Sequence, residues 1–303
     1  MAGVFEQFVA FGTDIVGLER LMRLLQSLFT ILTCYPGLIP LLLPAQTAHV
    51  HRRSGLAMLQ LSGHLNLTRR ALRLFWCLGS FRSSFSAWAG LPSESEKGLE
   101  TWLSITADSF FGLFGLVESV TLPDLLQVRH FSVLGYAEAV KLDGQAQGLW
   151  LAGLVCASLG SGIRLSREVF ARTARSPAVG EAVVVSDADG EETDDKTATT
   201  ENAGRGAGDA GAGRQQRDQQ PRRGREKEAL DKEHSRRIGG LTRKLAAEVL
   251  DVAIPAWSTG LADIEPGTVA VATFLSTILT GYAVWERCGR AIDEKARLDL
   301  ACK

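Results

Sequence analysis

Motifs that carry catalytic or metal-binding chemistry are absent from this sequence of 303 residues. It contains no HExxH helix, no GxSxG turn and no phosphate-binding loop. The five cysteines, an odd number without a CxxC pair, argue against a disulfide framework, and neither they nor the five histidines have the ligand spacing of a zinc site. We therefore expect a protein that is not an enzyme and that holds no metal and no cofactor.

Acidic residues are scarce in the apolar parts of the chain, and only two of them suggest a catalytic pair. Asp108 and Glu118 lie on one apolar stretch with helical character. On a helix they stand nearly three turns apart, so we expect no shared site. Both carboxylates are instead expected to be solvated or lightly buried.

An excess of charge of one sign is also missing. Lysine and arginine total 33 against 34 acids, for a net charge of -1, so no overall positive field predicts nucleic-acid binding. The N-terminal stretch has no basic region and carries Glu6 and Asp14, which is not typical of a signal peptide. Free thiols then fit a protein that is not secreted.

Apolar residues are abundant and unevenly distributed. They make up 46% of the chain although one long stretch is plainly hydrophilic, so they are concentrated in the remainder. They recur there with the period of a helix rather than that of a strand. The pattern predicts an all-α fold: a membrane-associated helical bundle with amphipathic helices and one or two transmembrane helices, interrupted by a disordered linker.

The sequence divides into three regions. Residues 1–176 are expected to form an N-terminal helical, membrane-remodelling region, and residues 237–303 a C-terminal amphipathic helix and anchor. Residues 177–236 consist mainly of Gly, Ala, Gln and charged residues. Because this composition cannot bury a core, the segment is expected to be a disordered linker.

Two charge-free runs are candidates for membrane crossing. Residues 267–285 include Tyr282 and Trp285 at one end, where aromatic residues favour a membrane interface. This run is long enough to span the hydrocarbon core. Residues 148–163 form a shorter run, so the sequence leaves open whether there are one or two crossings and on which side the linker lies.

The stretch "LNLTRRALRLFW", residues 65–76, separates basic from apolar side chains on a helical projection, and the chain has no acid between Met58 and Pro92. A helix that is basic on one face and apolar on the other suits the surface of an anionic bilayer, and we expect one over residues 61–81. Packing inside a bundle and contact with nucleic acid are the alternatives. The apolar residues predicted to insert are Leu61, Leu65, Leu72, Phe75 and Trp76, and those predicted to contact headgroups are Arg69, Arg70 and Arg73.

Three segments in this order resemble a known family. They are "GLERLMRLLQSLFTIL", "RRALRLFWCLGSF" and "LTRKLAAEVLDVAIPAW", the last followed by the charge-free run 267–285. The arrangement resembles the peroxin-11 family of peroxisomal membrane-proliferation proteins and is most similar to its gamma, or fungal C, branch. The resemblance covers nearly all of the chain except the linker.

The resemblance implies a protein of the peroxisomal membrane that inserts an amphipathic helix into the cytosolic leaflet and elongates the organelle before fission. It also implies binding to anionic lipids, self-association, and contact with other membrane-proliferation proteins and fission factors, without nucleic acid. Two other functions stay open. One is an adaptor whose linker recruits division factors. The other is a metabolite channel, for which the polar candidates are Thr273, Ser276, Thr277 and Thr280.

Overall fold

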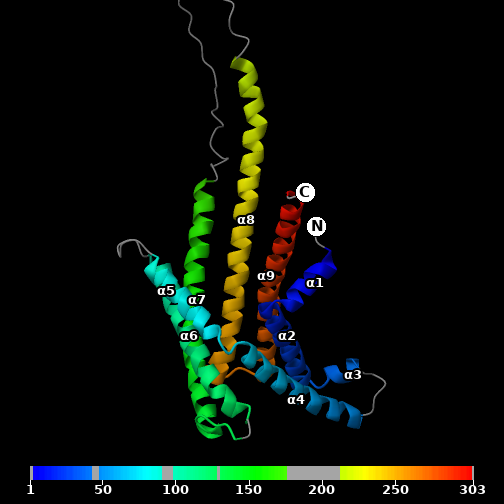
Figure 1. The fold of residues 1–303 in the computed structure, drawn as a ribbon. Helices are drawn as coiled ribbons and strands as arrows, with labels where there is room; N and C mark the ends of the chain where they lie inside the picture. The colour runs from blue at the N-terminus through cyan, green and yellow to red at the C-terminus, as the bar shows by residue number, and fades with distance from the viewer. Residues whose placement is uncertain (1–2, 43–47, 91–97, 128–129, 176–211, 302–303) are drawn as a thin grey trace, which may run out of the picture. The chain divides into compact units, whose positions relative to one another are not determined.

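The computed structural model describes residues 3–42, 48–90, 98–127, 130–175 and 212–301. Every regular element in these ranges is a helix, which confirms the all-α prediction (Figure 1). The helices are α1 (Val4–Thr13), α2 (Ile15–Cys34), α3 (Leu38–Leu42), α4 (Ala48–Leu72), α5 (Trp76–Ala89), α6 (Leu99–Leu125), α7 (Tyr136–Arg175), α8 (Ala212–Ser258) and α9 (Pro266–Ala301).

The chain forms two compact units. The first combines Met1–Ser166 with Gly240–Lys303, and the second is Arg167–Gly239, so α7 and α8 run through both. Part of the predicted linker, residues 176–211, lies outside the described residues. Helix α8 begins at Ala212, inside the C-terminal part of the predicted linker, where Gln, Arg, Glu, Lys and Ala are all good helix formers.

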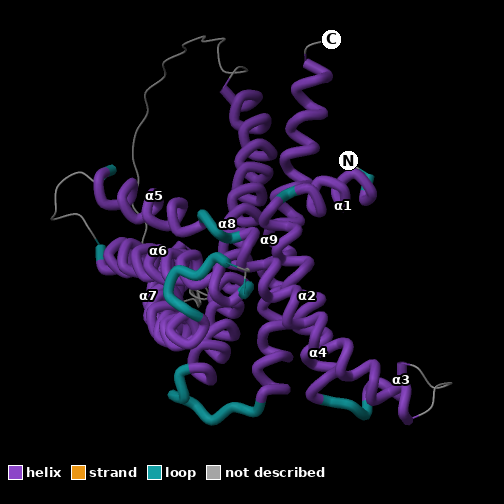
Figure 2. The backbone as a smooth tube through the Cα atoms, turned by 60° about the horizontal axis from the view of Figure 1, so that its bottom comes forward, coloured by secondary structure: helices purple, strands orange, loops and turns teal. Residues whose placement is uncertain are grey.

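Helix α2 lies at the centre of the first unit, where it packs against α4 and α9 (Figure 2). Its start is set by Asp14, whose carboxylate accepts hydrogen bonds from the backbone N–H groups of Val16 and Gly17 at 2.9 and 3.0 Å. These bonds satisfy two donors that a helix start otherwise leaves unpaired. The same carboxylate also accepts from Arg287 of α9 at 2.9 Å, which links both helices at this end.

Helices α5, α6 and α7 pack closely through small residues. A Cβ atom at Gly112 of α6 would lie 2.6 Å from the ring of Phe81, and one at Gly153 of α7 would lie 2.7 Å from the ring of Phe111. Phe114 of α6 also stacks on Trp150 of α7, with 5.5 Å between ring centroids. Glycine is therefore needed where an aromatic ring of the neighbouring helix lies against the backbone.

Among the described residues, three helices are long and apolar enough to cross a membrane: Leu99–Leu125, Tyr136–Ala171 and Pro266–Leu300. The last two contain the charge-free runs that the sequence identified. The first, in α6, was missed, because Asp108 and Glu118 interrupt its apolar sequence. In the structure Glu118 is buried and accepts a hydrogen bond from Arg73, and the half-buried Asp108 accepts one from Ser83, so both carboxylates have partners in the bundle.

The prediction of one continuous helix over residues 61–81 is wrong. Helix α4 ends at Leu72 and α5 begins at Trp76. Between them the backbone tightens, with hydrogen bonds from Arg73 N to Arg70 O at 3.1 Å and from Trp76 N to Arg73 O at 2.9 Å. Ser119 of α6 donates to the Leu74 carbonyl at 2.5 Å, so a tertiary contact satisfies an oxygen that the break leaves free.

Candidate functional site

Arg69 of α4 is buried against α2. Its Nη2 and Nε atoms lie 2.8 and 3.0 Å from the same carboxylate oxygen of Glu19, and its Nη1 atom donates to the side-chain oxygen of Gln26. Both members of the ion pair are almost completely withdrawn from solvent. A buried pair of this kind costs much to separate, because either partner alone would be an uncompensated charge. Arg69 therefore holds α4 to α2.

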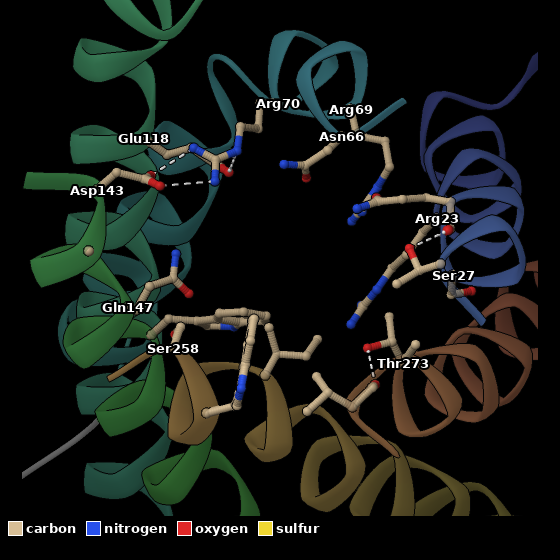
Figure 3. Close-up of a pocket in the computed structure, with 18 of the residues that line it drawn as sticks. Arg23, Ser27, Asn66, Arg69, Arg70, Glu118, Asp143, Gln147, Ser258 and Thr273 are labelled. Atoms are coloured by element: carbon tan, nitrogen blue, oxygen red, sulfur yellow. Dashed lines mark hydrogen bonds and ion pairs between the residues drawn. The ribbon is translucent and has the colours of Figure 1, made fainter. Parts of the chain in front are cut away.

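Arg70 and Arg73 bind acids of α6 and α7 (Figure 3). Arg70 donates two hydrogen bonds to Asp143, at 2.7 and 3.1 Å, in the bidentate geometry that guanidinium and carboxylate groups favour. Arg73 donates to Glu118 at 2.8 Å, and Nε of Arg70 lies 3.6 Å from the same oxygen. Glu118 is thus buried between two guanidinium groups, and the expectation that it is solvated or lightly buried is wrong.

Arg23 forms a third set of contacts, among α2, α8 and α9. Its Nη2 atom lies 2.5 Å from Oδ1 of Asp251, and its Nη1 atom lies 3.3 Å from Oδ2. The hydroxyl of Ser276 donates to Oδ1 at 2.5 Å. The buried carboxylate of Asp251 is thus hydrogen-bonded from both α2 and α9, as a buried charged group requires.

Glu19 stays ionised for an electrostatic reason. Burial by itself would raise the pKa of its carboxyl group, but the positive charges of Arg20, Arg69 and Arg73 outweigh this effect and leave the pKa below its usual 4.5. Burial lowers the pKa of the Arg69 guanidinium to about 9, which still leaves it charged at neutral pH. Both groups therefore carry full charge under physiological conditions.

A cavity of about 540 Å³ lies among these ion pairs (Figure 3). Its walls come from α2, α4, α6, α7, α8 and α9, together with Arg73 from the turn after α4. One side is polar and basic, and the other is apolar and aromatic. The lining includes Arg23, Asn66, Arg69, Arg70, Arg73, Phe114, Glu118, Asp143, Gly144, Gln147, Trp150, Ile254, Trp257, Val269 and Thr273.

The cavity lies toward one end of all three candidate spans. It is lined by residues from the second half of Leu99–Leu125 and from the first halves of Tyr136–Ala171 and Pro266–Leu300. The short connection between α6 and α7 makes these two helices run in opposite directions. The second half of α6 therefore lies beside the first half of α7. Were these helices to cross a bilayer, the cavity would open toward one membrane interface.

The family model for peroxisomal biogenesis factor 11 matches residues 5–285, which is almost the whole chain. The chain belongs to this family. It is therefore a protein of the peroxisomal membrane with a role in peroxisome biogenesis, and the predicted resemblance is confirmed, while the gamma branch stays a prediction. No curated protein and no solved structure matches the chain significantly.

Members of the peroxisomal biogenesis factor 11 family are biogenesis factors rather than a family of enzymes. In the parts of the chain that the structure describes, no group of three or more His, Cys, Asp or Glu side chains is placed to hold a metal ion. The acids of the central cluster are instead bonded to arginines. Glu19, Glu118 and Asp143 thus have a charge-pairing role in this fold.

The structure separates the residues predicted to bind the membrane into two groups. Leu61, Phe75 and Trp76 are exposed, whereas Leu65 and Leu72 are half-buried. The three arginines, expected to be free for headgroups, all make ion pairs within the bundle. Their partner acids come from 45, 50 and 73 residues away in the sequence, so the acid-free surroundings in the sequence did not reveal them. Membrane binding by these eight residues stays a prediction.

An apolar surface on α5 extends beyond the residues that the sequence singled out. Its members, all more than half exposed, are Phe75, Leu78, Phe85 and Trp88, and we call them the α5 apolar surface. Phe85 and Trp88 fall past residue 81, where the predicted amphipathic helix ended. The sequence could have revealed these two residues, because the helical period of apolar side chains continues through their positions.

The four polar residues considered as channel lining do not share one surface. Thr273 lines the cavity, whereas Ser276 and Thr277 are buried. The hydroxyl of Thr277 bonds the Thr273 carbonyl at 2.6 Å, and that of Thr280 bonds the Ser276 carbonyl at 2.9 Å. These hydroxyl groups thus satisfy carbonyls of their own helix, as is common for threonine in membrane helices.

Acid will weaken the contact between α2 and α4. Because the pKa of Glu19 is lowered in the folded protein, its stabilising contribution is present above pH 4.5 and is lost as the pH falls below that value. We expect the melting temperature of the purified protein in detergent to fall more steeply below pH 4.5 than that of Glu19→Gln. Parallel curves for the two proteins would contradict this assignment.

Proposed function

We propose that this chain elongates the peroxisomal membrane by inserting the α5 apolar surface, with Trp76 and Leu61 beside it, into one leaflet. The observation that carries the proposal is the exposure of Phe75, Leu78 and Phe85 on a helix of a membrane protein. A helix buried by one face expands one leaflet only, and the resulting difference in area bends the bilayer. Promotion of peroxisome fission would follow from this elongation.

The ion pairs of α4 would give the inserted helix a fixed position. Arg70 and Arg73 bind Asp143 and Glu118, which lie on two of the candidate spans. An apolar surface fixed to membrane-spanning helices cannot dissociate from the leaflet when bending of the bilayer opposes its insertion. Contact of Arg69 or Arg70 with headgroups at the membrane surface would require their ion pairs to open first.

Arg82 is the basic residue of α5 that is exposed within this surface. It lies one helical turn from both Leu78 and Phe85, so its stem can cover apolar surface while its charge stays at headgroup level. One basic residue near an anionic membrane contributes about 1 kcal/mol. Anionic lipid is thus the first partner expected for α5.

Loss of the apolar side chains tests the proposal. Leu78→Ser with Phe85→Ser should abolish tubulation of anionic vesicles by the reconstituted protein, because the inserted area is removed. The melting temperature should change little, since both side chains are more than half exposed. Electron microscopy of vesicles at a fixed ratio of protein to lipid measures the effect.

A matched control removes exposed apolar area elsewhere. Phe5 and Phe8 of α1 are also more than half exposed, and Phe5→Ser with Phe8→Ser should leave tubulation intact. Equal loss with both pairs would mean that any exposed apolar area suffices. Unchanged tubulation by the α5 variant would contradict the proposal.

Protein partners are proposed from family membership. We expect self-association and contact with other membrane-proliferation proteins and fission factors, because elongation of an organelle requires many copies acting together. Crosslinking of the full chain in peroxisomal membranes tests the self-association, and a monomeric pattern at all densities would count against it.

A further inference from the structure

The polar side of the cavity carries more positive than negative groups. Four arginines line it, against the carboxylates of Glu118 and Asp143 alone, because Glu19 and Asp251 lie behind their arginines and outside the lining. A guanidinium group has five N–H donors. Arg73 makes one hydrogen bond among the described residues, from Nη2 to Glu118, which leaves most of its donors for another acceptor. The wall thus has donor capacity left for an anion.

Neutral amides add to this donor capacity. Figure 3 shows the side chains of Asn66, from α4, and Gln147, from α7, directed into the cavity. An amide donates two hydrogen bonds and accepts others, so both can bind a polar headgroup without adding charge. Both side chains are half-buried, so a ligand in the cavity can reach their amides.

The opposite side of the cavity suits a hydrocarbon chain. Trp257, Ile254 and Val269 line it, next to the stacked pair of Phe114 and Trp150. A ligand that fills both sides must be an amphiphile with an anionic head. The volume of about 540 Å³ is typical of small-molecule sites and would hold a headgroup with the upper part of a chain.

The position of the cavity favours a lipid as the source of that amphiphile. It lies toward one end of the three candidate spans, with Trp150 and Trp257 in its wall. Tryptophan is enriched at the depth where headgroups meet the hydrocarbon. Basic pockets between transmembrane helices are known to bind anionic headgroups.

We propose that this cavity binds the headgroup of a single anionic phospholipid. Its phosphate would lie against Arg73, whose bond to Glu118 leaves most of its donors for another acceptor, and the first part of an acyl chain would lie along Ile254 and Trp257. The site is inside the bundle and separate from the α5 apolar surface. Either the lipid site or the membrane insertion of α5 can therefore fail without the other.

Occlusion of the cavity tests the proposal. Gly144 lines it, and a Cβ atom placed there would have no atom within 4 Å, so Gly144→Leu adds bulk without a clash at the backbone. We expect native mass spectrometry of the purified full chain to show one bound phosphatidic acid. Occupancy by phosphatidylcholine of the same chains should be at least about tenfold lower, and Gly144→Leu should lower phosphatidic acid binding by a similar factor.

Gly148→Leu is the matched control. Gly148 lies one turn further along α7, a Cβ atom there also has open space, and the residue is outside the lining. The Gly148→Leu variant should bind phosphatidic acid as the unchanged protein does. A second variant, Gln147→Leu, removes one amide from the cavity without adding bulk and should weaken binding about three- to tenfold.

Three outcomes would overturn the proposal. The first is equal binding of phosphatidic acid and phosphatidylcholine. The second is an equal loss of phosphatidic acid binding in Gly144→Leu and Gly148→Leu. The third is unchanged phosphatidic acid binding in both single variants, Gln147→Leu and Gly144→Leu. A competition arm separates the sources of phosphate. Millimolar inorganic phosphate should leave the lipid bound, and its displacement of the lipid would indicate a site for soluble anions instead.

Discussion

Glu19→Ala will lower the free energy of unfolding of the helical bundle by about 3–5 kcal/mol, because it leaves the guanidinium of Arg69 buried without its carboxylate. Glu19 and Arg69 have side chains only 1% and 8% exposed, so water cannot replace the lost partner without opening the contact between α2 and α4. Unfolding of the purified protein in detergent, followed by circular dichroism, measures the loss.

Two further variants show whether the loss comes from the unpaired charge. Glu19→Leu with Arg69→Met replaces both partners by apolar side chains and should recover most of the stability. Glu138→Ala removes an acid whose contact with Lys141 is exposed and 3.9 Å long, so it should cost less than about 1 kcal/mol. If Glu19→Ala were as mild as Glu138→Ala, the buried pair would not stabilise the bundle.

Arginine on the outer surface of α9 will prevent this helix from entering a bilayer. Leu275 and Ile278 are exposed near the middle of the charge-free run 267–285. Each arginine at such a depth costs about 2.5–3.5 kcal/mol in insertion scales, so Leu275→Arg with Ile278→Arg costs about 5–7 kcal/mol. In a fragment of residues 240–303, whose described part contains α9 as its one candidate span, the variant should be released by alkaline carbonate.

Controls on this experiment separate anchoring from general damage. The unchanged fragment should stay in the membrane pellet, because 19 residues of helix reach about 28 Å. Leu298→Arg, at an exposed position of α9 past the charge-free run, should stay in the pellet too. The full chain with both central arginines should also remain, held by α6 and α7. Release of the full chain would mean that these two helices do not anchor it.

The helical character of the chain and its last span follow from local pattern. Residues 267–285 carry no charge, and their apolar side chains follow a helical period. Neither property depends on any other part of the chain. Helix α6 shows the limit of such reasoning, since Asp108 and Glu118 argue against a span in the sequence. Only the fold shows that Glu118 is paired with Arg73 and that Asp108 accepts a hydrogen bond from Ser83 at 2.7 Å.

The sequence alone determined that residues 65–76 have one basic and one apolar face, because a helical projection uses only the spacing of neighbours. It could not determine what each face contacts. The acids that bind the three arginines lie 45 to 73 residues away, and the break after Leu72 has a hydrogen bond from Ser119 but no proline or glycine to signal it. Pairing of distant side chains depends on how the helices pack, and the period of a single helix does not predict which other helix it will pack against.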